Sequence, residues 1–135
     1  MKVFISYATE DYDTARRVYD DLKAAGVEPW LDREDLLPGG KWKYAIRKAI
    51  RESDYFLTLL SGRAVSKRGF VQKEQKLAME VADEMPEADI FILPVRLDNC
   101  EIPMSLEEIQ WVDLFPSYEK GMSKIIQLVS RSGMT

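Results

Sequence analysis

The stretch "KVFISYATEDYDTARRVYDDL" (residues 2–22) decides the fold of this chain. It starts with β-branched and aromatic residues at Lys2–Tyr7, which are typical of a strand, and continues into a polar break. One of the residues Thr9–Asp11 is placed to cap a helix, and Gly26 stands where a helix usually stops. Between them, apolar residues recur at helical spacing: Ala15, Val18, Tyr19, Leu22 and Ala25. The stretch therefore predicts a strand, a turn and a helix.

The same alternation of strand and helix repeats along the rest of the chain. Further strands are predicted at Val27–Leu31, Tyr55–Leu60, Ile90–Leu97 and Trp111–Leu114, and further helices at Trp42–Ile50, Phe70–Ala82 and Tyr118–Arg131. Ser105–Glu108 has the form of a capping box and predicts a short helix. Pro94 indicates that its strand lies near a sheet edge or is distorted.

Strands that alternate with helices predict a parallel sheet, because right-handed crossovers place the helices on the two faces. We expect an α/β fold in one domain over residues 1–135, with a flavodoxin-like five-stranded parallel sheet of order 2-1-3-4-5. In that order the ligand crevice lies at the carboxyl ends of strands 1 and 3, which hold Tyr7–Thr9 and Ser61-Gly62. The alternative is that the polar stretch after the first strand is only a strand exit and helix cap.

Composition narrows the possible functions. The chain has 135 residues, of which 46% are hydrophobic and 31% charged, and its net charge of −4 argues against direct nucleic-acid binding. The single Cys100 cannot form an internal disulfide, and neither a signal pattern nor a membrane-spanning apolar run is present, so we expect a cytoplasmic protein without a membrane partner. The absence of histidine excludes Ser-His-Asp and Cys-His catalysis and His-rich zinc sites, and no metal site is predicted.

Glu74 is the acidic residue that departs most clearly from its local pattern. Helical spacing places it near the middle of an apolar stripe, whose members are Phe70, Val71, Leu77, Ala78 and Val81. The same spacing directs the side chains of five polar residues away from this stripe: Gln72, Lys73, Gln75, Lys76 and Glu80. A carboxylate in an apolar face is costly unless it is paired, hydrogen-bonded or facing a cleft. Two interpretations stay open here, a buried ion pair or rim-reaching side chain and a catalytic carboxylate.

The segment "DREDLLPGGKW" (residues 32–42) is a second candidate. Pro38-Gly39-Gly40 permits unusual backbone angles ahead of a helix and could cradle a phosphate, but it lacks phosphate-loop spacing, and a Gly pair after proline is far more often a plain turn. A tryptophan in the position of Trp42 is more often a core residue than a stacking surface. The basic residues of the following helix favour a solvated face over a membrane contact.

Four motifs in this order resemble those of a Toll/interleukin-1 receptor (TIR) domain of the bacterial or stand-alone type. They are "VFISYATED", "VEPWLDREDLLPGGKW", "AIRKAIRESDYFLTLLS" and "SKRGFVQKE", and the similarity continues to "WVDL". Receiver domains share the topology, but they carry a phospho-acceptor aspartate at the end of strand 3, where this chain has Ser61.

The resemblance implies two functions. Some TIR domains cleave NAD⁺ at the nicotinamide–ribose bond, and the glutamate that is essential in them corresponds to Glu74. In those, NAD⁺ is the substrate and no cofactor is bound. The positions that correspond to the nucleotide-binding surface are Ser6, Tyr7, Ala8, Asp32, Trp42 and Ser61. The sequence departs from some NAD-cleaving relatives at Ala8-Thr9, where they carry two arginines, and at Asp35, where they carry a lysine. The product (ADP-ribose, a cyclic isomer or a conjugate) stays open.

The second implied function is assembly. TIR domains associate with other TIR domains as homo-oligomers or filaments, and some act only as non-enzymatic signalling modules. The contact loop corresponds to Arg33, Leu37, Pro38, Gly39, Gly40 and Lys41. Catalytic members are generally activated by self-association, within immune or defence signalling and under a regulatory domain or partner protein.

Overall fold

The computed structural model describes residues 1–31, 39, 41–65, 73–84 and 91–132. Its elements in chain order are β1 (Lys2–Ser6), η1 (Thr9–Asp11), α1 (Tyr12–Ala24), β2 (Glu28–Trp30), α3 (Trp42–Glu52), β3 (Tyr55–Leu60), α4 (Lys73–Asp83), β4 (Phe91–Arg96), η2 (Met104–Leu106), β5 (Val112–Asp113) and α5 (Tyr118–Ser132). The elements η1 and η2 are single 3₁₀ turns.

The five strands form one parallel sheet in the order β2-β1-β3-β4-β5, which confirms the predicted fold class and topology. The central strand β3 is buried at every residue, because it has a strand on each side and helices over each face. Pro94 precedes the two pairs that join β4 to β5, Val95↔Val112 and Arg96↔Asp113. Because β4 lies next to the edge strand β5, the prediction that this strand lies near a sheet edge is confirmed.

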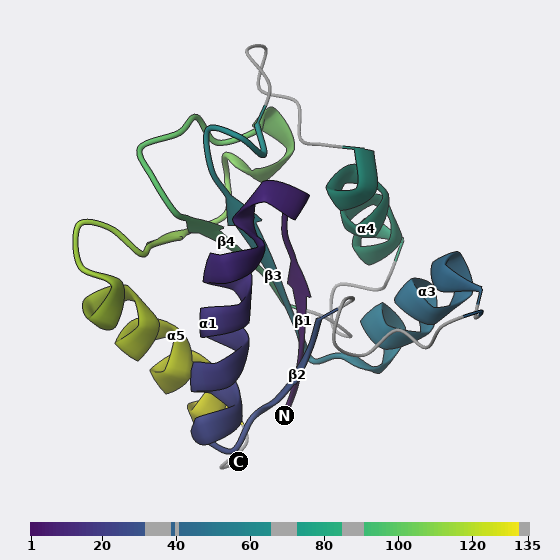
Figure 1. The fold of residues 1–135 in the computed structure, drawn as a ribbon, viewed down its shortest axis with the longest axis horizontal. Coiled ribbons are helices and arrows are strands. Elements are labelled where there is room, and N and C mark those ends of the chain that lie inside the picture. Colours follow the sequence, from purple (N-terminus) through teal and green to yellow (C-terminus); the bar gives the residue numbers. More distant parts are fainter. Residues whose placement is uncertain (32–38, 40, 66–72, 85–90, 133–135) are drawn as a thin grey trace.

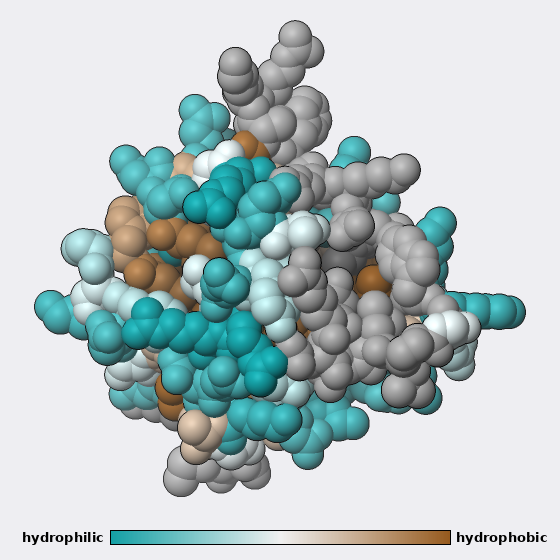
Figure 2. Space-filling view, in the orientation of Figure 1, coloured by the Kyte–Doolittle hydropathy of each residue, from teal (hydrophilic) through white to brown (hydrophobic). Residues whose placement is uncertain are grey.

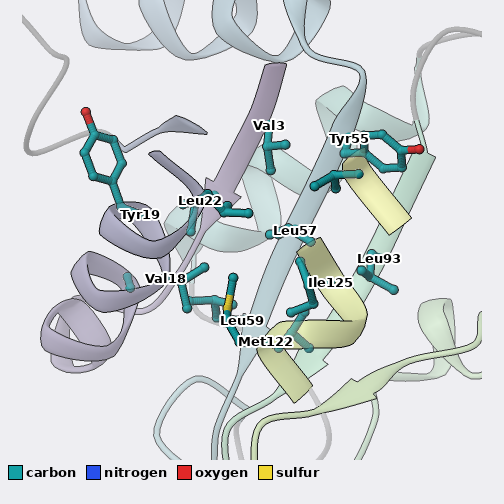
Figure 3. Close-up of a cluster of buried hydrophobic side chains, with 14 of the residues drawn as sticks. Val3, Val18, Tyr19, Leu22, Tyr55, Leu57, Leu59, Leu93, Met122 and Ile125 are labelled. Carbon is teal, nitrogen blue, oxygen red and sulfur yellow. The ribbon is translucent and has the colours of Figure 1, made fainter. Parts of the chain in front are cut away.

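Helices cover the two faces of the sheet in pairs (Figure 1). On one face α1 and α5 pack through Leu22 and Ile125 on alternate strand residues such as Leu57, in the cluster of apolar side chains drawn in Figure 3. On the other face α3 and α4 cover Phe4 and Phe56, whose rings stack 5.3 Å apart. The alternation of strand side chains between faces divides the core into these two layers.

The surface over α1 differs from the core beneath it. Figure 2 shows mainly hydrophilic side chains on the outward side of this helix, beside a smaller hydrophobic area. The buried residues of α1 are Ala15, Val18, Tyr19 and Leu22, so four of the five predicted apolar positions face the sheet, whereas Ala25 is exposed because the helix ends at Ala24. The predicted amphipathic helix is confirmed.

The predicted capping box is wrong. The short turn η2 begins at Met104, and its N-cap is Pro103, so Ser105 lies inside the turn and cannot be its N-cap. The capping-box pattern depends only on residues close together in the sequence. In the structure the chain enters the turn earlier than this pattern predicts, and Leu106 is buried against Leu60 and Val65 at the end of the sheet.

Gly121 shows how closely α5 approaches β5. A Cβ placed on Gly121 would collide with the carbonyl oxygen of Asp113 and lie 2.8 Å from Cδ2 of Leu114. The backbone at Asp113 cannot retreat easily, because the strand is paired to β4 and the next residue's N–H bonds to the Arg96 carbonyl at 2.9 Å. The helix therefore packs at a distance that only glycine permits.

We predict that Gly121→Ala lowers the free energy of unfolding by about 1–3 kcal/mol, as overpacking does, despite the better helix propensity of alanine. Urea unfolding followed by circular dichroism measures the change. Ser123→Ala, at an exposed position of the same helix, is the control and should leave stability within about 0.5 kcal/mol. Equal stability of the two variants would contradict the packing argument.

Candidate functional site

The carboxyl ends of β1 and β3 are joined by a buried hydrogen bond between side chains. Ser61, directly after β3, is 3% exposed and donates its hydroxyl to Oδ2 of Asp11 at 2.5 Å. Asp11 is 7% exposed and lies in η1, which follows β1. The same Ser61 hydroxyl accepts a bond from the Ala64 N–H at 3.1 Å. One serine thus connects η1 to the turn that leaves β3.

The turn after β3 has two further contacts to neighbouring segments. The Gly62 N–H donates to both carboxylate oxygens of Asp98, at 3.1 and 3.0 Å, and Asp98 lies just after β4. The Arg63 guanidinium donates to the Glu10 carbonyl in η1 at 3.0 Å. The edge of the sheet where parallel α/β folds bind ligands is therefore cross-linked by polar contacts.

Gln75, in the first turn of α4, is buried at this edge. It is 2% exposed, and its Nε2 donates to Oγ1 of Thr58 at 2.9 Å and to the carbonyl of Leu59 at 2.7 Å. The expectation that Gln75 points away from the apolar stripe is wrong. Its amide can be buried because two acceptors of β3 satisfy both of its N–H groups.

The Leu59 carbonyl needs a side-chain donor because β1 ends before β3 does. The last β1 residue, Ser6, is level with Thr58. The Leu60 carbonyl accepts from the Leu97 N–H on the β4 side, so the carbonyl before it, that of Leu59, faces the β1 side beyond the end of that strand. Gln75 supplies the donor there and fastens the first turn of α4 to the gap between β1 and β3.

The structure places the other predicted residues as follows. Ser6 and Ala8 are buried, at 4% and 1% exposure, and Tyr7 is half-buried with its ring 6.1 Å from that of Tyr12. Together with Ser61 they lie at the same edge of the sheet. Their contact with a nucleotide stays a prediction.

Glu74 lies in the first turn of α4, directly before Gln75, and seven residues before the buried Val81, a spacing that returns to one side of a helix. Trp42 is the first residue of α3. The side chains of Glu74 and Trp42 lie outside the described part of the structure, as do the residues Asp32, Arg33, Leu37, Pro38 and Gly40.

Two described residues remain of the predicted assembly loop. Gly39 has a positive φ of 78°, and no atom of the described residues lies within 4 Å of the position that a Cβ would take on it. Lys41 is exposed. The φ value agrees with the expectation of unusual backbone angles in this segment.

A second polar cluster, not predicted from the sequence, surrounds Arg96 at the end of β4. Its guanidinium holds the Asp113 carboxylate at 2.8 and 3.0 Å, and this hydrogen bonding keeps the pKa of Asp113 below its usual value. It also donates to the Cys100 carbonyl at 3.0 Å. Burial, followed by the charge of Asp98, raises the pKa of the Cys100 thiol to about 11, so this thiol stays protonated at neutral pH and is a poor nucleophile.

Sequence comparison decides the family. The family model for the TIR domain matches residues 3–126, which is most of the chain. The chain belongs to the TIR domain family.

The relatives of this TIR domain are distant. It is 24% identical over 110 residues to an uncharacterized protein y4cD of Sinorhizobium fredii, and 35% identical over 66 residues to the NAD(+) hydrolase TcpC of Escherichia coli. These matches cover 82% and 48% of this chain but only 17% and 22% of the relatives, so the chain spans about a fifth of their length.

Among solved structures, the TIR domains of the activated Roq1 resistosome, which recognizes the pathogen effector XopQ, have a similar fold. The TM-score is 0.73 at 18% identity, over 97% of this chain and 98% of that chain. Within the described residues, no helix of this TIR domain combines the length and apolar character that crossing a membrane requires.

Two of the residues that build the site were not assigned to it from the sequence. Asp11 was a candidate helix cap and does stand at the N-cap of α1, but its side chain makes no capping bond there and binds Ser61 instead. No sequence pattern pointed to Gln75 as a site residue, because helical periodicity placed it on the polar side of its helix.

We predict that Ser61→Ala lowers the free energy of unfolding by about 1–3 kcal/mol, because it leaves the buried Asp11 carboxylate without its hydroxyl donor. Thermal and urea unfolding measure the loss. Ser53→Ala is the matched control, since Ser53 is also a buried serine but donates to a neutral helix carbonyl, that of Ala49, at 2.7 Å. A smaller loss for Ser61→Ala than for Ser53→Ala contradicts the assignment.

Proposed function

We propose that this TIR domain cleaves NAD⁺ at the nicotinamide–ribose bond, with Glu74 as the catalytic carboxylate, and that self-association activates it. The activity belongs in the cytoplasm and in immune or defence signalling, as in the TIR domains that the sequence resembles. NAD⁺ is then a substrate, and the reaction needs no bound cofactor.

The observation that carries this proposal is the anchoring of α4. Gln75 bonds to Thr58 and Leu59 at the end of β3, so the backbone of the preceding residue, Glu74, lies at the edge where β1 and β3 end. Ligands of open α/β sheets bind at this point, where the direction of winding switches. This position of the Glu74 backbone supports the assignment of its carboxylate to the predicted crevice.

The chemistry suits a chain without histidine. Nicotinamide leaves as a neutral molecule from a cationic pyridinium, so its departure needs no general acid. The barrier comes mainly from the positive charge that develops on the ribose in an oxocarbenium-like transition state. A carboxylate near the ribose stabilises that charge electrostatically, and water completes the cleavage.

The similarity to TcpC gives separate support. That protein is named as an NAD(+) hydrolase, and its match with this chain reaches 35% identity over about half of the chain. The alternative function is a non-enzymatic TIR module that acts through TIR–TIR contacts alone. Incubation of the purified protein with NAD⁺, with products identified by mass, separates the two functions.

We expect Glu74→Gln to lower nicotinamide release by about a hundredfold or more, because a preorganised electrostatic group is lost. The unfolding temperature should stay equal or rise, since a carboxylate that faces a cleft gives the fold little. A Glu74 that is only a buried ion-pair partner would instead lose about 3–5 kcal/mol of stability on substitution.

The control for this experiment is Glu80→Gln, which makes the same change at an exposed position of the same helix and should keep wild-type activity. A Glu74→Gln protein that melts much earlier yet cleaves NAD⁺ at the wild-type rate per folded molecule refutes the catalytic role. Absence of cleavage by the assembled wild type favours the non-enzymatic module.

The second part of the proposal assigns self-association to the loop before α3. Gly39 and Gly26 form a matched pair for testing it, because both have positive φ, 78° and 84°, and an added Cβ on either would have no neighbour within 4 Å among the residues that the structure describes. A substitution at either glycine therefore introduces similar backbone strain.

We predict that Gly39→Asp reduces self-association and concentration-dependent activity, whereas Gly26→Asp, with the same strain and charge, does not. Light scattering over a concentration series, with and without a crowding agent, measures assembly. Equal assembly of the two variants argues against the loop, and a wild type that is monomeric under all these conditions argues against self-association itself.

A further inference from the structure

We propose that Gln75 is a positioning residue for the NAD⁺-cleaving reaction, in that its amide fixes the backbone of Glu74 relative to the ends of β1 and β3. This inference rests on the proposed function and adds to it a residue that acts through Glu74.

The orientation of the Gln75 amide is set by its surroundings. The Leu59 carbonyl can only accept a hydrogen bond, so the group 2.7 Å from it must be the NH₂ side of the amide. The second N–H donates to Thr58, which is fully buried. Both bonds run from one side chain in the first turn of α4 to two successive residues of β3, and two bonds to a rigid central strand restrict both translation and rotation of that turn.

The Gln75 amide carries a cost as well as a gain in stability. Oε1 of Gln75 is buried and has no hydrogen-bond partner among the described residues, and an unsatisfied buried acceptor is destabilising. A methionine of nearly the same length would lack that acceptor, but it would also leave the Leu59 carbonyl and the Thr58 hydroxyl without the donors that Gln75 supplies. The amide therefore pairs two buried acceptors of β3 and also sets a fixed distance between α4 and the end of that strand.

Fixed placement matters in a site that works by electrostatics. The stabilisation that a carboxylate gives to a developing cation falls with distance, and small displacements of a catalytic group from its productive geometry cost up to about a hundredfold in rate. Gln75 directly follows Glu74 in the chain, so a shift of the backbone at Gln75 also moves Glu74.

The test compares Gln75→Met with Val81→Ala. Val81 is 2% exposed on the same helix and packs in the apolar cluster of Phe4 and Phe56, away from the first turn. We expect Gln75→Met to lower the unfolding midpoint, because it leaves the buried Leu59 carbonyl without its donor, and to lose about tenfold or more in kcat per folded molecule, with KM changed less than about twofold. Val81→Ala should lower the unfolding midpoint and keep kcat per folded molecule.

Thr58→Val gives a second route if Gln75→Met folds poorly. It removes one of the two acceptors without changing shape, should lower kcat less than Gln75→Met, and should add nothing to it in the double variant. Hydrogen exchange gives a readout that needs no activity: amides 77–79, which in a helix donate to the carbonyls of residues 73–75, should exchange faster in Gln75→Met than in Val81→Ala.

The outcomes separate the two proposals. A wild type that cleaves NAD⁺, with unchanged kcat in Gln75→Met, overturns the role of Gln75 and leaves the proposed function standing. A rise in KM at constant kcat also overturns it, because Gln75 then binds substrate instead of positioning Glu74. A wild type without cleavage overturns the proposed function, and unchanged exchange at amides 77–79 overturns the clamp itself.

Discussion

The unequal length of β1 and β3 is the constraint on which the candidate site depends. β1 stops at Ser6, level with Thr58, while β3 continues to Leu60, so the Leu59 carbonyl lies in the interior without a strand neighbour. A buried carbonyl left unpaired costs about 1–3 kcal/mol, which is a large part of the stability of a small domain. Gln75 meets this requirement from α4, and in doing so determines where that helix begins relative to the sheet.

The same edge collects polar contacts from three separate connections. Ser61 donates to the carboxylate of Asp11 from the β1–α1 connection, and Gly62 donates to Asp98 from the segment after β4. Gln75 comes from the β3–β4 connection. Each contact pairs a polar group at the end of β3, where the reversal of winding order leaves the sheet edge open. A rim whose own backbone and hydroxyl groups are already paired holds its shape, as a site that acts by preorganised charge requires.

The sequence predicted those features that depend on local pattern. Tyr55–Leu60 is a strand with the predicted bounds, because six successive buried residues between polar flanks fit a central parallel strand. Ser105 was assigned to a cap that Pro103 occupies, because a capping-box pattern cannot show where a distant core fixes the chain. Gln75 and Asp11 could not be assigned for a related reason. Periodicity sorts residues by polarity, and it misplaces a polar side chain that is buried by a hydrogen bond to a group far away in sequence. The partner of Asp11 is 50 residues away, whereas the departure of Glu74 from the apolar pattern is itself local.

Different kinds of contact hold the beginning and the end of α4. Ile50 of α3 lies in one apolar cluster with Val81 and Ala82, toward the end of α4, whereas the hydrogen bonds of Gln75 hold the beginning of that helix. Apolar contacts have no preferred direction and tolerate small sliding movements, but the two bonds of an oriented amide do not. We therefore expect displacements of α3, which follows the proposed assembly loop, to be absorbed along the end of α4, while the turn that carries Glu74 keeps its place on β3.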